Sequence, residues 1–461
     1  MRSLGGRVLS LLYFLAPTLA QNLSDGQVAL VRQRLAEGAT KSWELGTRAQ
    51  TLLELDAPSF SVLTPAPNIV PPIIPLNSTA NFTLSDVLSI AQSVVSNLST
   101  TSVPADGRPL IDGDGSAADP ASIGVAVMLA NWTSLPGPNY AQAIEAQVTY
   151  LLGGQVPKSS KGAISHRVSE VQLWSDFIYM VPPTLAYYGV VTNNKSMVQE
   201  AYTQIKLYRD VLRDDHAKGL WKHIELGSFN DSGHWSTGNG WAAMGMLRVL
   251  GTMQDSQFSG SFKNQMKDLG NWAFEIQQAM YPQLQSNNLF RNYADEDNSF
   301  SDAASTALMA ASVYRLSLLT GKHTHLPDAE RSRTTLFSLS NSSSEAASPA
   351  ATSTSPSSAR PSTGTSSSSQ ISPTATPSPT VFSSAQHFTS DGWLTPVVNP
   401  NSFGDEGSDS PEAQAFVLMM QSAWRDWVAA GAVGANGALG RHEGVATWGS
   451  VWLALLIVLW I

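Results

Sequence analysis

One acidic side chain stands in a strongly apolar segment, where a carboxyl group could act as a general acid. Asp176 is the only charged residue of "VQLWSDFIYMVPPTLAYYGVVTNN", residues 171–194. Apolar surroundings disfavour the ionised form and raise the pKa of a carboxyl group, which suits a general acid near neutral pH. The alternative is that Ser175 or Asp176 only caps the short helix that Pro182-Pro183 ends.

A second aspartate could complete a catalytic pair. Asp119 in "DGDGSAADPASIGVAVMLANW" directly precedes Pro120, an arrangement typical of a helix N-terminus. Backbone N–H groups and the helix dipole there would hold its carboxylate ionised. An ionised Asp119 beside a neutral Asp176 could divide the roles of acid–base catalysis. The other interpretation is that Asp119 is a structural cap.

Two histidines follow predicted turns and could hydrogen-bond a substrate, although a lone histidine is more often structural. His166 stands in "GAISHR" and His223 in "GLWKHIE". The sequence has no cysteine and no H-E-x-x-H spacing, which excludes cysteine-ligated zinc, thiol catalysis and a disulfide scaffold. We expect no metal site.

The stretch "HWSTGNGW", residues 234–241, combines two glycines with two tryptophans and runs into a helical pattern. Glycines let a backbone approach a ligand closely. Trp235 and Trp241 could offer flat faces to a sugar. Packing in the protein core is the alternative for either ring.

Helical periodicity must supply the elements that position these residues. The predicted helices span residues 26–54, 84–99, 120–133, 139–153, 171–188, 196–213, 239–253, 260–281, 302–319, 326–337 and 411–429. Short links between neighbours favour antiparallel hairpins. The sequence therefore predicts an all-α fold with almost no strands, a closed ring of helical hairpins, with two helical domains as the alternative.

Both ends of the sequence indicate secretion. Residues 1–20 have the positive region, short apolar run and small-residue site of a signal peptide. Residues 431–461 have small residues, a short spacer and an apolar run, the order of a GPI-attachment signal. Gly434 or Asn436 is the expected attachment residue, and a retained C-terminal membrane anchor is the alternative. We therefore expect a secreted protein, GPI-anchored to the plasma membrane at the cell surface or cell wall. The glycosylation sequons are at Asn22, Asn77, Asn81, Asn97, Asn131, Asn194, Asn230 and Asn341.

Residues 338–385 are rich in Ser, Thr, Pro and Ala, a composition that buries too little apolar surface to order itself. In a secreted chain this composition is typical of an O-glycosylated spacer. A helical pattern resumes within residues 386–430. We therefore predict one domain, residues 21–337 and 386–430, with a disordered insertion; a separate C-terminal module is the alternative. The net charge of −9 argues against a nucleic-acid partner.

Four motifs together resemble the unsaturated rhamnogalacturonyl hydrolases, glycoside hydrolase family 105, close relatives of the unsaturated glucuronyl hydrolases. They are "GAISHR…VQLWSDFIYMVPPTLAYYG", "LWKHIE…HWSTGNGW", "SDAASTALMAASVYRL" and "DGWLTPVV…SPEAQAFVLMMQSAWRDW", in this order. The resemblance covers roughly residues 112–427. It implies an (α/α)6 toroid of six helical hairpins, with the site in the mouth where the inner helices begin.

The resemblance also implies a mechanism for oligosaccharides left by a lyase, which end in an unsaturated uronic acid. Asp176 would protonate the vinyl-ether double bond and then help water to add, with Asp119 as the second acidic residue. The resulting hemiketal opens and releases the next sugar. The implied substrate contacts are His166, His223, Trp235, Thr237, Asn239 and Trp241. No metal or cofactor is implied, and we expect a monomer.

Thr237 departs from the family pattern, which is R-G-N-G-W at this stretch. An arginine forks onto a carboxylate, and threonine cannot. Lys222 or Arg291 could supply the positive charge, or the substrate is not a standard unsaturated uronide, or activity is weak. Two other functions stay open. One is an inverting glycosidase with Asp176 and Asp119 roughly 6.5–9.5 Å apart; the other is a non-catalytic glycan-binding wall protein.

Overall fold

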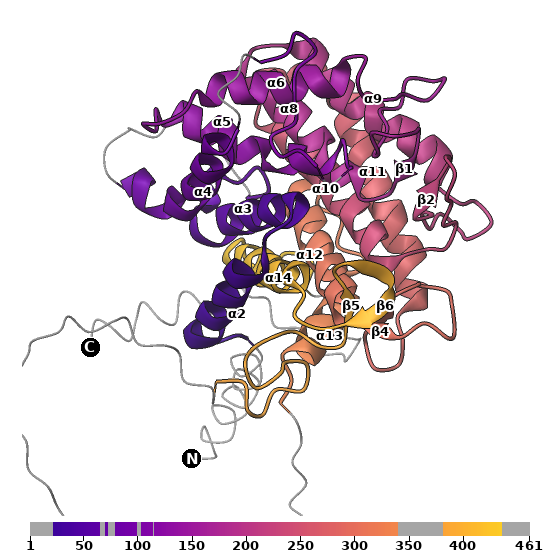
Figure 1. Cartoon of the computed structure of the whole chain (residues 1–461). Helices are drawn as coiled ribbons and strands as arrows, with labels where there is room; N and C mark the ends of the chain where they lie inside the picture. Colours follow the sequence, from indigo (N-terminus) through magenta and orange to yellow (C-terminus); the bar gives the residue numbers. More distant parts are fainter. Residues whose placement is uncertain are drawn as a thin grey trace, which may run out of the picture.

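A computed structural model describes residues 22–64, 70–71, 79–98, 103–113, 115–339 and 381–435 of the chain. In these residues six inner helical positions form a ring, and six outer helices surround it (Figure 1). The ring closes because α14 packs against both α12 and α3. The predicted (α/α)6 toroid is confirmed.

The helices alternate between the two layers along the chain. The inner positions are α3 (Ser42–Asp56), η2 (Asp119–Ile123) continuing into α5 (Gly124–Trp132), α7 (Phe177–Met180) with α8 (Pro182–Val191), α10 (Ser236–Gln254), α12 (Ala303–Thr320) and α14 (Pro411–Ala429). The outer helices are α2 (Asp25–Gly38), α4 (Thr79–Ser96), α6 (Tyr140–Leu152), α9 (Lys195–Leu212), α11 (Lys263–Met280) and α13 (Leu326–Leu336). Short 3-10 turns are η1 (Pro58–Phe60), η3 (Ser259–Ser261) and η4 (Tyr281–Gln283).

Three small antiparallel strand pairs connect the helices within the described residues. They are β1 (Leu173–Trp174) with β2 (Ile224–Glu225), β3 (Phe290–Arg291) with β4 (Ser301–Asp302), and β5 (Val397–Asn399) with β6 (Ser402–Gly407). The near-absence of strands agrees with the sequence prediction.

Burial differs between the two layers as their sequences require. The inner helix α10 is buried at every residue from Ser236 to Met253. The outer helix α9 instead buries a stripe at helical spacing, which includes Ala201, Ile205 and Tyr208. Helices that are buried on all sides therefore form the inner ring, and amphipathic helices cover it.

Two glycines of α10 set its distance from the segment that carries Asp176. A Cβ at Gly238 would lie 2.2 Å from Ser175 Oγ, and one at Gly245 would lie 2.1 Å from the carbonyl oxygen of Ile178. Only glycine fits such close approaches. These two positions therefore allow α10 to support the turn that presents Asp176.

The predicted helix boundaries are wrong at two places. The single helix predicted over residues 26–54 is two helices, α2 and α3, because the backbone N–H groups of Thr40 and Lys41 bond the Glu44 carboxylate and start a new helix. The helix predicted over residues 171–188 is divided into β1, α7 and α8.

The chain on either side of the Ser/Thr-rich segment meets in space. Gln386 N donates to Ser338 O at 3.0 Å, and Leu339 forms a bridge with Ala385. The following helix α14 is an inner member of the same ring. Residues 340–380 lie outside the described residues, so the domain boundaries stay predictions.

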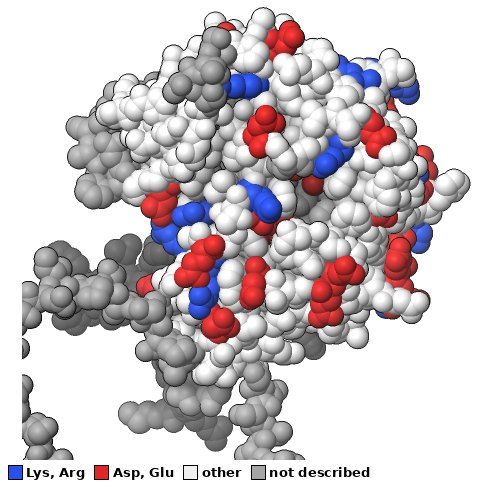
Figure 2. Space-filling model, viewed as in Figure 1, with Lys and Arg blue, Asp and Glu red and all other residues white. Residues whose placement is uncertain are grey.

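Residues 1–21 and 436–461 also lie outside the described residues, and they contain the predicted signal peptide and most of the predicted GPI-attachment signal. Among the residues that the structure describes, none of the helices has the length and apolar character needed to cross a membrane. Acidic and basic side chains are interspersed over the face drawn in Figure 2.

Candidate active site

A cavity of about 430 Å³ opens where the inner helices begin. Its walls come from the starts of α3, η2, α10 and α14, from the turn before α7, and from the β5–β6 hairpin. The lining residues are Lys41, Trp43, Asp119, His166, Arg167, Trp174, Asp176, Met180, His223, Trp235, Trp241, residues 398–403 and Glu412. The cavity therefore lies at the predicted end of the ring.

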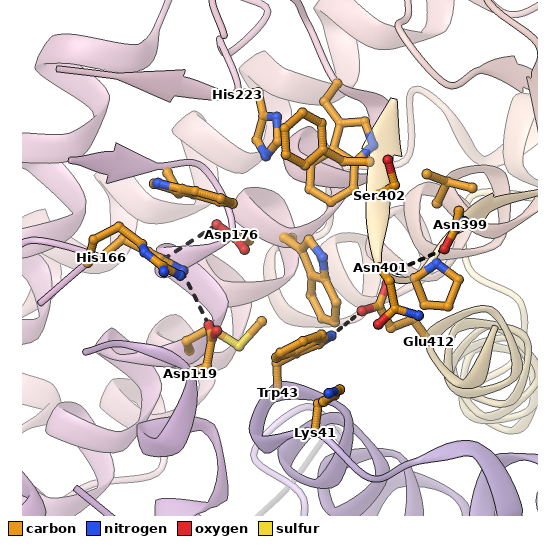
Figure 3. Close-up of a pocket in the computed structure, with 18 residues that line it drawn as sticks. Lys41, Trp43, Asp119, His166, Asp176, His223, Asn399, Asn401, Ser402 and Glu412 are labelled. Carbon is orange, nitrogen blue, oxygen red and sulfur yellow. Dashed lines mark hydrogen bonds and ion pairs between the residues drawn. The ribbon is translucent and has the colours of Figure 1, made fainter. Parts of the chain in front are cut away.

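One wall of the cavity, which we call the catalytic wall, consists of Asp119, His166 and Asp176 (Figure 3). The imidazole of His166 lies between the two carboxyl groups. Its Nε2 is 3.5 Å from Asp119 Oδ1, and its Nδ1 is 3.7 Å from Asp176 Oδ1. The ring also stacks on Trp174, with the centroids 4.8 Å apart. The two aspartates and the histidine singled out in the sequence are therefore brought together.

The environment of Asp176 favours the protonated form of its carboxyl group. Burial raises the pKa of its carboxyl group to about 7, against the opposing pull of nearby backbone N–H groups and of Arg167. Its Oδ1 is buried and has no hydrogen-bond partner among the described residues. Burial lowers the pKa of His166 well below its usual value, and the Arg167 charge acts in the same direction. A neutral imidazole thus faces a carboxyl group that is largely protonated below neutral pH.

The capping interpretations of the two aspartates are wrong. Asp176 precedes α7, but its side chain makes no capping hydrogen bond. At η2 the Oγ of Ser116 accepts from the backbone N–H groups of Ala118 and Asp119, at 3.1 and 3.0 Å. Ser116 therefore satisfies the helix start, and the Asp119 carboxylate is turned toward His166.

His223 lies on the cavity lining with one ring nitrogen fixed. Its Nδ1 is 2.8 Å from Asp231 Oδ2, and Asp231 also accepts from the Tyr293 hydroxyl. Its Nε2 has no hydrogen-bond partner among the described residues. Burial lowers the pKa of His223, so the ring is neutral at physiological pH. Since Asp231 favours the proton on Nδ1, Nε2 can accept a hydrogen bond from a substrate hydroxyl.

Trp235 and Trp241 combine the two roles that the sequence left open. Both contribute to the cavity lining, yet they are only 7% and 2% exposed. Trp235 Nε1 donates to Asn292 Oδ1, and the Trp241 ring packs on Tyr179 and Phe416. Each tryptophan is therefore a core residue that presents one small surface to the cavity.

Two predicted substrate contacts, Thr237 and Asn239, lie outside the cavity lining. Both are fully buried. Asn239 bonds the backbone of Trp221 in both directions, and Thr237 Oγ1 donates to Asp302 Oδ2 at 3.4 Å. Their assignment to the substrate is corrected, because hydrogen bonds within the protein occupy both side chains.

The two cations considered for the missing arginine are also elsewhere. Lys222 pairs with Glu225 at 2.8 Å, and Arg291 pairs with Asp297 at 3.2 Å. Neither Lys222 nor Arg291 lines the cavity.

Lys41 and Arg167 are the cations that line the cavity instead. The Arg167 guanidinium lies over the Trp174 ring, 5.9 Å from its centroid. It is close enough to Asp176 and His166 to lower the pKa of both groups. The signal for Arg167 was present in the sequence, since it follows His166 directly in "GAISHR".

The facing side of the cavity, which we call the opposite wall, consists of residues 398–403 with Trp43 and Glu412 (Figure 3). Trp43 Nε1 donates a short hydrogen bond to Glu412 Oε1. Burial raises the pKa of Glu412 to about 8, and the acidic neighbours Glu44 and Asp176 add to the rise. No sequence pattern indicated this wall, whose residues come from α3, the β5–β6 hairpin and α14.

The catalytic wall is also a possible metal site. Asp119, His166 and Asp176 can each offer one donor atom within 4.8 Å of the others. A neutral imidazole and two carboxylates suit a divalent cation. Such an ion would require Asp176 to be ionised, so metal binding and use of Asp176 as an acid exclude each other.

The spacing of the two aspartates bears on the inverting alternative. An inverting glycosidase keeps its carboxyl groups roughly 6.5–9.5 Å apart, which leaves room for a water molecule. Here one oxygen of each aspartate lies within 4.8 Å of the other, and both face the same imidazole. The geometry therefore disfavours inversion by this pair.

The model of one known family matches the chain. The sequence profile of Glycosyl Hydrolase Family 88 matches residues 96–338, just over half of the chain. The match includes Asp119, His166, Asp176 and His223. No curated protein matches the chain significantly.

Three solved structures with similar folds have low sequence identity to this chain. A possible member of family GH105 from Klebsiella pneumoniae is 14% identical, with a TM-score of 0.58, over 86% of this chain and 91% of the other. A family 88 hydrolase from Bacteroides vulgatus is 12% identical, with a TM-score of 0.54, over 87% and 98%. An unsaturated glucuronyl hydrolase specific for heparin is 12% identical, with a TM-score of 0.52, over 88% and 97%. At such identity the likeness shows the fold.

Proposed function

The chain belongs to glycosyl hydrolase family 88, and we propose that it hydrolyses oligosaccharides that end in a 4,5-unsaturated uronic acid, such as lyase products of pectin or rhamnogalacturonan. The observation that carries this proposal is Asp176, a buried carboxyl group that lines the cavity and whose pKa is raised to about 7. A protonated carboxyl group can deliver a proton to an electron-rich double bond.

The reaction balances with Asp176 as both acid and base. Its proton goes to C4 of the double bond, which leaves a cation at C5 that the ring oxygen stabilises. Water adds to C5 and returns one proton to the Asp176 carboxylate. The hemiketal then opens, and the unmasked hemiacetal at C1 releases the next sugar as an alcohol. Asp119 holds the neutral His166 ring beside Asp176, and His223 Nε2 accepts a hydrogen bond from a sugar hydroxyl.

A uronic acid also needs a partner for its carboxylate. Arg167 and Lys41 are the cations on the cavity lining, and no salt bridge is found for either among the described residues. We assign the carboxylate to Arg167, because its guanidinium lies beside the catalytic wall and can bond a carboxylate in a bidentate manner. This assignment removes the need for an arginine at position 237.

The test is the ultraviolet absorbance of the double bond. Purified protein should abolish this absorbance in oligosaccharides made by pectin, rhamnogalacturonan or glycosaminoglycan lyases, while Asp176→Asn should not. Unchanged absorbance with every lyase product would overturn the substrate. Reducing-sugar release from saturated glycans would then support the alternative glycosidase, and glycan binding without turnover would support a wall protein.

We further propose that the enzyme acts at the cell surface. Secretion is supported by the predicted signal peptide and by sequons at the exposed residues Asn97, Asn131 and Asn230. Membrane attachment is supported by the order of residues 431–461. Release of activity from intact cells by a GPI-specific phospholipase would support the anchor, and activity only in the medium would contradict it.

A further inference from the structure

An exposed phenylalanine lies just outside the cavity and is not among its lining residues. Phe229 is 52% exposed, and it is the only aromatic residue among the large exposed apolar side chains that the structure describes. A single exposed apolar residue needs no explanation by itself. Phe229 differs from the other exposed apolar residues because it lies beside the cavity and because hydrogen bonds hold the backbone of its loop.

Aromatic rings connect Phe229 to the catalytic centre. Its centroid is 6.4 Å from that of Phe403, a lining residue of the opposite wall. Phe403 in turn lies 4.5 Å from His223 and 6.1 Å from Trp174. The surface around Phe229 is thus continuous with the cavity.

The backbone of this loop is held in place. Ser228 donates from both its N–H and its hydroxyl to the Glu170 carboxylate, at 2.7 and 2.6 Å. Gln172 Nε2 donates to the carbonyl oxygen of Phe229 at 2.7 Å, and Gln172 Oε1 accepts from Trp174 Nε1 at 2.8 Å. One glutamine therefore fixes Phe229 relative to Trp174, on which His166 stacks. A loop whose backbone is held before binding loses little conformational freedom when a ligand covers it.

We propose that Phe229 is a stacking platform for the leaving part of the oligosaccharide, which forms a subsite outside the cavity. This inference rests on the proposed function. The cavity volume of about 430 Å³ accommodates the end of the oligosaccharide, so the remaining sugars of a bound chain must lie outside the cavity, beyond its opening. The apolar C–H face of a sugar can pack on the flat ring of Phe229. The enzyme therefore favours longer unsaturated oligosaccharides over disaccharides.

The test compares chain lengths. Unsaturated disaccharides and tetrasaccharides from one lyase are assayed with wild type, Phe229→Ala and Phe229→Trp, after enzymatic removal of N-glycans because Asn230 begins a sequon. Phe229→Ala should lower kcat/KM for the tetrasaccharide roughly three- to tenfold, through KM, and leave the disaccharide unchanged. Phe229→Trp should keep the preference for length. Leu226→Ala is the matched control, since Leu226 is 39% exposed in the same loop and has no ring to stack.

The outcomes separate this inference from the proposed function. An equal loss for both substrates would indicate that Phe229 only supports Trp174, and no loss for either would exclude the platform. If wild type consumes no unsaturated oligosaccharide, the proposed function fails. Binding of the tetrasaccharide to Asp176→Asn, with and without Phe229→Ala, is then measured by calorimetry and tests the role of Phe229 without turnover. Equal affinities of the two proteins, or no binding to either, would overturn the proposed platform.

Discussion

The two walls of the cavity each present a buried carboxyl group with a raised pKa, but the two groups have different partners. Asp176 Oδ1 on the catalytic wall has no hydrogen-bond partner among the described residues, whereas Glu412 Oε1 on the opposite wall accepts from Trp43 Nε1. Burial is the largest cause of the higher pKa in both cases. The raised pKa therefore does not by itself distinguish a reactive acid from a structural one.

The difference in partners makes that distinction. An unsatisfied buried oxygen is costly, so it persists where function needs a group that can bond something absent from the resting protein. Glu412 has its partner already, and its bond joins the start of α3 to the start of α14. We therefore expect substitutions on the catalytic wall to change the reaction, and those on the opposite wall to change stability and the shape of the cavity.

Asp176→Asn should have the largest effect. The amide keeps the shape of the side chain but cannot donate the proton, so kcat should fall by about 10²–10⁴-fold. The melting temperature at neutral pH should not fall, because a neutral amide replaces a group whose ionisation is disfavoured by burial. Loss of absorbance at the wild-type rate would show that another residue is the acid.

Arg167 should control substrate affinity more than turnover. Arg167→Gln should raise KM for an unsaturated uronide roughly tenfold or more, because a charge-assisted hydrogen bond to the carboxylate is lost. Arg167→Lys should recover part of the loss, since it restores the charge without the bidentate geometry. Equal KM values for all three proteins would assign the carboxylate elsewhere, and Lys41→Gln would then be the next variant to measure.

The pH dependence of stability should report both carboxyl groups. Their pKa values in the folded chain are about 7 and about 8, above the usual values of 3.8 for aspartate and 4.5 for glutamate. Each group therefore binds its proton more tightly when folded, and this contribution is complete below about pH 4 and lost as the pH rises through about 8. The melting temperature should fall between pH 5 and pH 8 by less in Asp176→Asn and in Glu412→Gln than in wild type. Parallel curves would contradict the raised pKa values.

Two substitutions of Glu412 should show whether its hydrogen bond to Trp43 or its ionisable carboxyl group matters. Glu412→Gln keeps an acceptor for Trp43 Nε1 and should change kcat/KM by less than about threefold. Glu412→Leu leaves that indole donor without its partner and should cost about 1–3 kcal/mol of stability, measured by denaturant unfolding. A large loss of kcat in a stable Glu412→Gln protein would move Glu412 into the catalytic machinery.

Metal removal should have no effect on activity. The donor set of Asp119, His166 and Asp176 could bind a divalent cation, but the proposed reaction needs a protonated Asp176. EDTA should leave the rate unchanged, and added Zn²⁺ should inhibit if it occupies the site. Inactivation by EDTA that Zn²⁺ reverses would contradict the proposed role of Asp176.

Local patterns singled out the three residues of the catalytic wall as candidates, and the structure brings them together, but they singled out none of the opposite wall. Asp176 and His166 stand in short segments whose composition is itself unusual. Trp43 and Glu412 have ordinary neighbours, and only the closure of the ring places them side by side. No local signal encodes a contact between residues 369 positions apart.

Thr237 shows a second limit of sequence patterns. Its difference from the expected arginine suggested a gap in the substrate site. In the structure Thr237 is buried and bonds Asp302, whose other oxygen accepts from the backbone N–H of Val398 at 3.1 Å. Through Asp302, Thr237 therefore supports the backbone of the opposite wall, and the cations that line the cavity, Lys41 and Arg167, come from other segments.

The contact between α3 and α14 has a consequence for the order of synthesis. The ribosome releases Trp43 early, but Glu412 follows only when almost the whole described chain has been made. Until then α3 lacks one of its neighbours in the ring, and the opposite wall of the cavity is incomplete. Any chain that stops before α14 should therefore be without activity, because the ring and its cavity would both be incomplete.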